Sequence, residues 1–273
     1  MNRIITIAVL ICSGVLFAEE VEETECNKTL PIWISASVDI NSKYMWRGTI
    51  MNDRPVWQPC VCLGYKSEEY GGIYASVWSS MDLTHKRNVI GGNSRRNCGM
   101  QELDYYLGYT KSFDSLSIEI GHWWYTYLND NYDPYNDLVL SAEYDFELVV
   151  PGAEVWWSYL DQDQMDNCFW FNFFLKRDFS FLDGAVVVTP KASLGFGDKN
   201  HTNNYLGERK VEFTDQTTEL KVVYKVTENI NIGARIAYTW LPSKTARDGR
   251  WMTYGHDGRK QMVHGGVSFG VSF

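Results

Sequence analysis

The chain ends on residues 264–273, HGGVSFGVSF, in which apolar residues alternate with small or polar ones. Val267, Phe269, Val271 and Phe273 share one face of this stretch when it is extended. A period of two is typical of a β-strand with one apolar face. The last residues of a soluble domain usually fray, so a complete strand at this position needs a partner. We expect that partner to be the first strand, in a sheet that closes on itself.

The same alternation recurs along the whole chain. In residues 218–226, TELKVVYKV, Leu220 and Tyr224 fall on one face and Glu219 and Lys225 on the other. Such segments of about ten residues are typical of strands that cross a bilayer. About twelve strands are predicted, near residues 32–46, 57–67, 71–82, 101–112, 115–126, 137–147, 153–161, 168–177, 185–196, 216–226, 230–241 and 260–273.

The connections between these strands alternate in length. Short turns follow every second strand, and longer polar segments such as 83–100, 197–215 and 242–259 lie between them. This is the layout of an outer-membrane barrel, with short periplasmic turns and longer extracellular loops. In hydrocarbon every backbone polar group needs an internal partner, which a closed sheet supplies. The sequence therefore predicts an all-β fold, an antiparallel transmembrane β-barrel of about twelve strands.

The N-terminal residues have the pattern of an export signal. Arg3 precedes a short apolar run, and Ala18 is a suitable cleavage residue. We therefore expect a signal peptide at 1–18, a periplasmic segment at 19–31 and the barrel at 32–273. The expected location is the outer membrane of a Gram-negative bacterium.

Charge and cysteine content narrow the function further. The chain has 34 acidic and 25 basic side chains, a formal net charge of −9, and an exported acidic protein is a poor partner for nucleic acid. Neither a cofactor nor a metal site is predicted, because no ligand frame for zinc or calcium is present. Signal cleavage would leave five cysteines whose pairing the spacing does not fix: Cys26, Cys60, Cys62, Cys98 and Cys168.

Residues 35–59, SASVDINSKYMWRGTIMNDRPVWQP, contain a Ser-x-Tyr-x-x-Arg-Gly pattern at Ser42, Tyr44, Arg47 and Gly48. This stretch resembles the first strand and loop of the TorF-like porin family. The resemblance implies a channel, with no agreed substrate and no functional residue to carry over. The C-terminal Phe269, Val271 and Phe273 likewise resemble the signal that the barrel-assembly machinery recognises in bacterial outer-membrane proteins.

The inward faces of the predicted strands carry charges that sort by position. Acidic residues gather on the fourth to seventh strands and basic residues on the eighth to eleventh. We expect these groups to face one another, either as a transverse field across the lumen or as a salt-bridged plug. The candidate pore-lining residues are Glu102, Asp104, Glu119, Glu143, Asp145, Glu154, Lys176, Lys191, Lys221, Lys225 and Arg235.

The predicted function is passive diffusion of small polar solutes through an outer-membrane porin. Two alternatives stay open: a non-conducting structural or adhesive barrel, and a soluble periplasmic β-sandwich that binds a ligand. No enzyme is predicted, because Trp124 stands two residues after His122, where outer-membrane phospholipases carry serine. Basic segments at 84–97 and 242–260 suit contact with lipopolysaccharide or an anionic solute, although solvated loops explain them more simply. The oligomeric state is left open.

Overall fold

The computed structural model describes residues 31–84, 100–128, 134–159, 166–248 and 260–273. The predicted signal peptide, Cys26, Cys98 and most of the basic segment at 84–97 lie outside these ranges. So does most of the predicted periplasmic segment at 19–31. Within the described residues, no helix is long and apolar enough to cross a bilayer.

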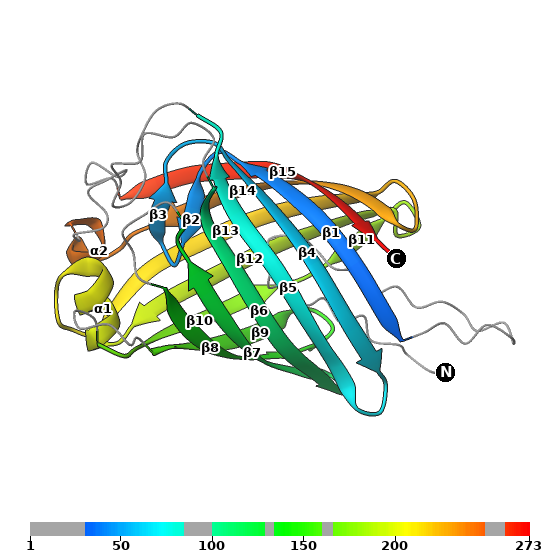
Figure 1. Cartoon of the computed structure of the whole chain (residues 1–273), viewed down its shortest axis with the longest axis horizontal. Helices are drawn as coiled ribbons and strands as arrows, with labels where there is room; N and C mark the ends of the chain where they lie inside the picture. The colour runs from blue at the N-terminus through cyan, green and yellow to red at the C-terminus, as the bar shows by residue number, and fades with distance from the viewer. Residues whose placement is uncertain (1–30, 85–99, 129–133, 160–165, 249–259) are drawn as a thin grey trace, which may run out of the picture.

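The described residues form a closed barrel of twelve antiparallel strands (Figure 1). Each strand pairs with its neighbours along the chain, and the last strand pairs with the first. The ring confirms the predicted fold class and contradicts the β-sandwich alternative, because a sandwich has two separate sheets with open edges. The strands are β1 (Ile32–Asn41), β4 (Val56–Ser67), β5 (Gly71–Asp82), β6 (Met100–Phe113), β7 (Leu116–Thr126), β8 (Tyr135–Tyr144), β9 (Val150–Tyr159), β10 (Cys168–Lys176), β12 (Val186–Gly197), β13 (Glu212–Lys225), β14 (Ile230–Trp240) and β15 (Gln261–Ser272).

The C-terminal strand closes the ring as its alternation predicted. Val38 of β1 stands opposite Phe269 of β15. The Ile34 N–H donates to the Phe273 carbonyl over 3.0 Å, and the Phe273 N–H donates back over 2.9 Å. The final residue is therefore hydrogen-bonded to the first strand, as a barrel requires because it has no edge strand.

The two ends of the barrel differ, as the spacing predicted. Short connections lie at the end where the C-terminus is found, and one of them contains the short strand β11 (Phe179–Phe181). The longer connections lie at the opposite end, with the helices α1 (Lys199–Leu206) and α2 (Lys244–Asp248) (Figure 1). These are called the turn end and the loop end.

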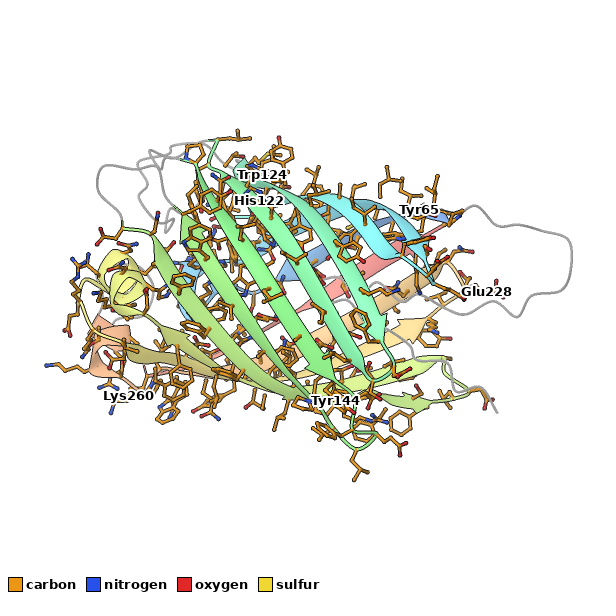
Figure 2. All side chains as sticks on the ribbon, turned by 90° about the horizontal axis from the view of Figure 1, so that it is seen from below. Tyr65, His122, Trp124, Tyr144, Glu228 and Lys260 are labelled. Carbon is orange, nitrogen blue, oxygen red and sulfur yellow. The ribbon has the colours of Figure 1, made fainter. Side chains whose placement is uncertain are left out.

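The strands bury one face and expose the other. On β6, Tyr105, Leu107 and Tyr109 point outward and are exposed, while Asp104 and Tyr106 are buried inside. Side chains cover the outer wall, with His122 and Trp124 on it toward the loop end (Figure 2). An apolar exterior around a polar interior is the arrangement that a bilayer demands of a barrel.

Several strand ends differ from prediction by a few residues. The largest difference is at β1, which stops at Asn41, while residues predicted to continue it to 46 form β2 (Tyr44–Trp46), which pairs with β3 (Thr49–Asn52) in a separate hairpin. Periodicity continues from β1 into β2 because both segments are extended, so alternation alone does not reveal the break. β8 stops at Tyr144, three residues before the predicted end.

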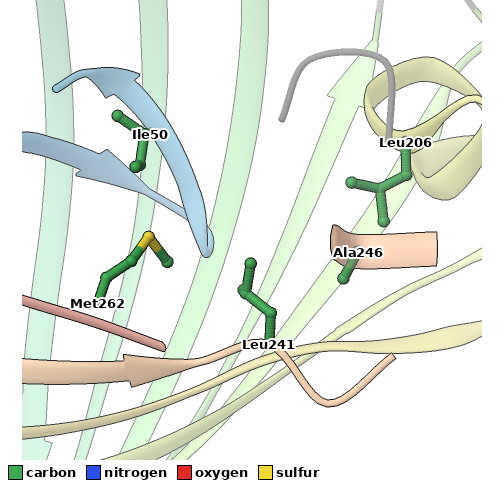
Figure 3. Close-up of a cluster of buried hydrophobic side chains, with 5 residues drawn as sticks. All are labelled: Ile50, Leu206, Leu241, Ala246 and Met262. Carbon is green, nitrogen blue, oxygen red and sulfur yellow. The ribbon is translucent and has the colours of Figure 1, made fainter. Parts of the chain in front are cut away.

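The β2–β3 hairpin packs against both loop helices. Ile50 of β3 belongs to an apolar cluster completed by Leu206, Leu241, Ala246 and Met262 (Figure 3). Helix α1 begins at Asp198, whose carboxylate accepts from the His201 N–H over 2.7 Å, and ends at Gly207 with φ 76°. These contacts fix the loop end around the hairpin.

Candidate functional site: a lumen narrowed by a hairpin

The β2–β3 hairpin crosses the interior of the barrel. It leaves the wall between β1 and β4. Its tip contacts β8 through Asp137 and β13 through Asp215. In the closed ring, β8 is four strands from β4 and β13 is three strands from β1, and the Arg47 side chain also reaches Trp156 of β9 and Trp170 of β10 on the far side. The hairpin therefore spans the lumen and narrows it near the loop end.

The turn of this hairpin requires a special backbone. Arg47 has φ 47° and Gly48 has φ 76°, both in the left-handed region that glycine adopts without strain. A Cβ on Gly48 would lie 2.6 Å from the Asp215 Cβ, nearer than real Cβ contacts come. Glycine is needed here for its backbone conformation and for close approach to the wall.

Arg47 anchors the tip of the hairpin. Its guanidinium forms an ion pair and a hydrogen bond with Asp137 of β8, and the two side chains are 4% and 0% exposed. The Tyr125 hydroxyl donates to the same Asp137 carboxylate over 3.2 Å. The guanidinium carbon also lies 4.1, 4.7 and 5.2 Å from the ring centroids of Trp46, Trp156 and Trp170. Cation–π attraction of this kind is strongest where water is excluded.

The other residues of the Ser-x-Tyr-x-x-Arg-Gly pattern hold the base of the hairpin. The Ser42 N–H donates to the Gly265 carbonyl over 2.8 Å, and its hydroxyl accepts from the Gly265 N–H over 3.1 Å. Tyr44 packs edge-on against Trp78 with the ring centroids 5.5 Å apart. The pattern thus marks the segment that folds into the lumen, although nothing in it shows that the loop turns inward.

The acidic side of the lumen is filled with aromatic rings. Tyr74, Tyr106, Trp123 and Tyr125 form a buried cluster along β5 to β7. Glu119 lies among them and accepts hydrogen bonds from the Tyr74 and Tyr106 hydroxyls. The sequence predicted that these strands present acidic side chains inward. In the structure, aromatic rings on the inner face of the same strands cover Glu119.

The remaining acidic candidates differ in environment. Glu102 and Asp104 on β6 are buried. Glu154 on β9 accepts from Trp156 and Asn172, each over 3.2 Å. The placement of Asp145 on an inward-facing strand position was wrong. Because β8 ends at Tyr144, Asp145 lies in the following turn.

The basic candidates are only partly neutralised. Lys176 pairs with Glu143 over 2.7 Å, and Arg235 pairs with Glu219 over 2.9 Å. Lys191 lies 4.3 Å from the centre of the Phe174 ring. Lys221 is buried and Lys225 half-buried, both on β13. The structure therefore pairs Lys176 and Arg235 with acidic residues of other strands, while Lys191 has no ion pair among the described residues, which lies between the two arrangements that the sequence suggested.

An interior cavity lies beside the tip of the hairpin, against the basic side of the barrel. Its volume is about 220 Å³. Of the predicted pore-lining residues it touches Lys191 and Arg235 and none of the acidic group. The full lining is Met45, Arg47, Gly48, Trp170, Asn172, Lys191, Ser193, Asp215, Thr217, Glu219, Arg235, Thr239 and His264.

Groups able to hold a metal ion are not gathered here. Within the described ranges, no three side chains of His, Cys, Asp or Glu are placed to coordinate one. The Cys60 and Cys62 sulfurs lie 3.7 Å apart on the inner face of β4. Cys168 is buried on β10.

The loop helix α1 carries a buried histidine with a shifted pKa. Burial, and secondarily the positive charge of Arg47, lowers the pKa of His201 well below its usual range. The His201 ring packs on Tyr205 with centroids 4.7 Å apart. Both residues support the hairpin from the loop side, since Tyr205 also packs on Trp46 at 5.3 Å.

A closed antiparallel barrel with an apolar exterior and a polar, narrowed interior has the architecture of bacterial outer-membrane barrels. Residues 25–240 match the family described as "Bacterial protein of unknown function (Gcw_chp)", and the chain belongs to that family. Comparison with curated proteins gives no significant match.

Solved structures of porins share the fold at low sequence identity. The NanC porin is 13% identical with a TM-score of 0.50, over 87% of this chain and 98% of that one. The KdgM porin in complex with disordered oligogalacturonate is 10% identical with a TM-score of 0.48, over 88% and 99%. The anion-selective porin from Comamonas acidovorans is 8% identical with a TM-score of 0.42, over 89% and 98%. At these identities the likeness concerns the fold alone.

Proposed function

We propose that this protein is an outer-membrane channel for passive diffusion of small polar solutes. The observation that carries the proposal is the polar cavity beside the hairpin, inside a closed barrel with an apolar exterior. Twelve strands lie between the eight that side chains just fill and the sixteen to eighteen of wide porins. The hairpin reduces the passage further, so the channel admits small solutes only.

Export and assembly belong to the same proposal. The N-terminal residues supply a cleaved signal, and the outward row ending in Phe273 suits recognition by the barrel-assembly machinery. Residues Ser42, Tyr44, Arg47 and Gly48 support membership of the TorF-like porins within this barrel class. Lipopolysaccharide is the proposed surface partner at the loop end. No catalytic role is proposed, since His122 faces outward beside Trp124 with their ring centroids 3.8 Å apart.

The test is single-channel recording of the purified, detergent-folded protein in a planar bilayer. Discrete conductance steps are expected from the native chain. A variant with residues 43–53 replaced by a short glycine-rich turn should give larger steps, because the hairpin obstructs the lumen. Silence from both proteins, with folding verified by circular dichroism and heat-modifiable mobility, would refute the channel.

A non-conducting barrel is the second candidate, and one observation favours it. The hairpin and the aromatic cluster around Tyr106 together fill much of the interior. Under this alternative the native chain stays silent while the hairpin-deleted variant conducts. That result would show that the hairpin closes the lumen permanently. It would favour a structural or adhesive role for the surface loops.

A further inference from the structure

We infer that the lumen cavity is a binding site for small carboxylate anions, with Lys191 and Arg47 as the two cationic groups. This inference rests on the proposed channel function and names its solute class. It depends on which charges around the cavity are already neutralised and which are not.

Arg47 has one guanidinium nitrogen without a hydrogen-bond partner. One guanidinium nitrogen, Nη2, is committed to Asp137. The other, Nη1, is buried and has no hydrogen-bond partner, although Arg47 lines the cavity. A buried donor left unsatisfied costs roughly 1–3 kcal/mol. A solute acceptor at this position would remove that cost.

Lys191 is the second available cation. Across the strands it stands opposite Lys176 on one side and Glu219 on the other. Lys176 is paired with Glu143, and Glu219 is paired with Arg235. In the parts of the chain that the structure describes, Lys191 has no ion pair and contacts the Phe174 ring instead.

The carboxylates at the cavity are less available. Glu219 is held by Arg235 over 2.9 Å. Asp215 accepts from Thr214 over 3.0 Å and from Thr217 over 3.5 Å, and it lies beneath Gly48 at the hairpin tip. The other predicted acids do not reach the cavity, because aromatic side chains fill their side of the barrel. Arg47 is paired with Asp137 and Arg235 with Glu219, so the charges left at the cavity are Lys191 and the buried Asp215, and Lys191 is the more accessible of the two to a solute.

Size and lining select a small organic anion. A volume of about 220 Å³ is below the roughly 300–1,000 Å³ of typical drug-sized ligand pockets. Trp170 and Met45 offer apolar contact for a carbon skeleton, while Asn172, Ser193 and Thr217 offer neutral hydrogen bonds. Two cations on separate elements, the hairpin and β12, suit a short mono- or dicarboxylate better than a sugar chain.

The test combines binding with conduction on the full-length, detergent-folded protein. Binding is followed by tryptophan fluorescence, since Trp170 lines the cavity, with succinate as the anionic probe and succinamide as its neutral analogue. Conduction is followed by reversal potential in a salt gradient. The variants are Lys191→Gln, the charge-retaining Lys191→Arg, and Glu119→Gln as a matched neutralisation away from the cavity.

The native protein is expected to bind succinate saturably and succinamide weakly, and to prefer anions. Lys191→Gln should weaken succinate binding by about tenfold or more, the scale of one charge-assisted hydrogen bond. It should also reduce the anion-to-cation permeability ratio by about tenfold, because one charge at about 6 Å in a water-filled lumen favours anions and disfavours cations by about threefold each. Lys191→Arg and Glu119→Gln should resemble the native protein.

The failures of the two proposals are distinguishable. Saturable succinate binding without conductance would support the site and refute the channel. Conductance with equal responses to succinate and succinamide, or unchanged by Lys191→Gln, would overturn the carboxylate site and leave the channel standing. A selectivity change caused by Glu119→Gln but not by Lys191→Gln would also overturn it.

Discussion

Removing the Arg47 charge should release the hairpin from the lumen. In Arg47→Met the side chain stays long and unbranched but loses its guanidinium, so Asp137 is left as an uncompensated buried carboxylate. Breaking a buried pair in this way costs about 3–5 kcal/mol. Burial of Ile50, an apolar anchor of the hairpin, contributes about 1.5–3 kcal/mol in the other direction. At about 1.4 kcal/mol per decade, a loss of about 3 kcal/mol lowers the equilibrium constant for seating of the hairpin by at least about a hundredfold.

Trypsin provides an assay that does not depend on conduction. Lys43 directly precedes the hairpin, and cleavage after it should be faster in Arg47→Met, whereas Arg54 is followed by Pro55 and resists trypsin. Single-channel steps should become larger in parallel. Arg47→Met combined with Asp137→Asn should recover part of the native protection, since no buried charge is then left alone.

The control is the partly exposed ion pair between Arg177 and Asp145 at the turn end. Arg177 lies 3.1 Å from Asp145, and the two side chains are 32% and 42% exposed. Such a pair contributes about 0–1 kcal/mol, so Arg177→Met should leave cleavage and conductance unchanged. Native cleavage rates and native conductance in folded Arg47→Met would refute the argument that this arginine holds the hairpin.

Further predictions concern the turn, the loop helix and the closing strand. Gly48→Ala should destabilise hairpin seating by about 2–5 kcal/mol, from left-handed strain and overpacking together, measurable as faster tryptic cleavage. Gly184→Ala, at φ 84° with nothing within 4 Å of an added Cβ, carries only the strain of about 1–2 kcal/mol. Burial lowers the pKa of His201, so the stability that packing of α1 contributes should be complete above a pH of about 6.5 and decline below it, because only the opened state gains a proton there. Hydrogen exchange of the α1 amides between pH 7 and 5 would show this decline, and His201→Gln should abolish the pH dependence. Deleting Phe273 removes two hydrogen bonds to Ile34 and the proposed assembly signal, so the heat-modifiable fraction in outer membranes should fall; an unchanged fraction would contradict both roles.

The fold was largely predictable because a barrel strand has a simple pattern. Each strand faces lipid on one side and the interior on the other, so period-two alternation places it within a few residues. The exceptions are residues that continue the alternation of a strand in the sequence but lie outside the barrel strands in the structure. Residues 44–46 are extended like β1 but belong to the hairpin, and Asp145 continues the alternation of β8 although the strand ends at Tyr144.

The residues of the candidate site were predictable from the sequence, but their arrangement was not. The sequence marked Arg47 and Gly48 as part of a motif, and it placed acids and bases on different strands. It did not indicate that Arg47 meets Asp137, 90 residues away. Nor did it indicate that tyrosines would cover Glu119.

Sequence alone therefore determined the strands, their inward and outward faces and the alternation of turns and loops, because these depend on contacts between near neighbours and on the solvent that each face meets. Tertiary structure decided that the first loop enters the lumen, which charges are neutralised, and where space remains. Those outcomes depend on closure of the sheet, which brings β1 against β15 and sets the residues of opposite walls at fixed distances. Side chains far apart in the chain then compete for the same interior, and their volumes and charges decide which of them line the cavity.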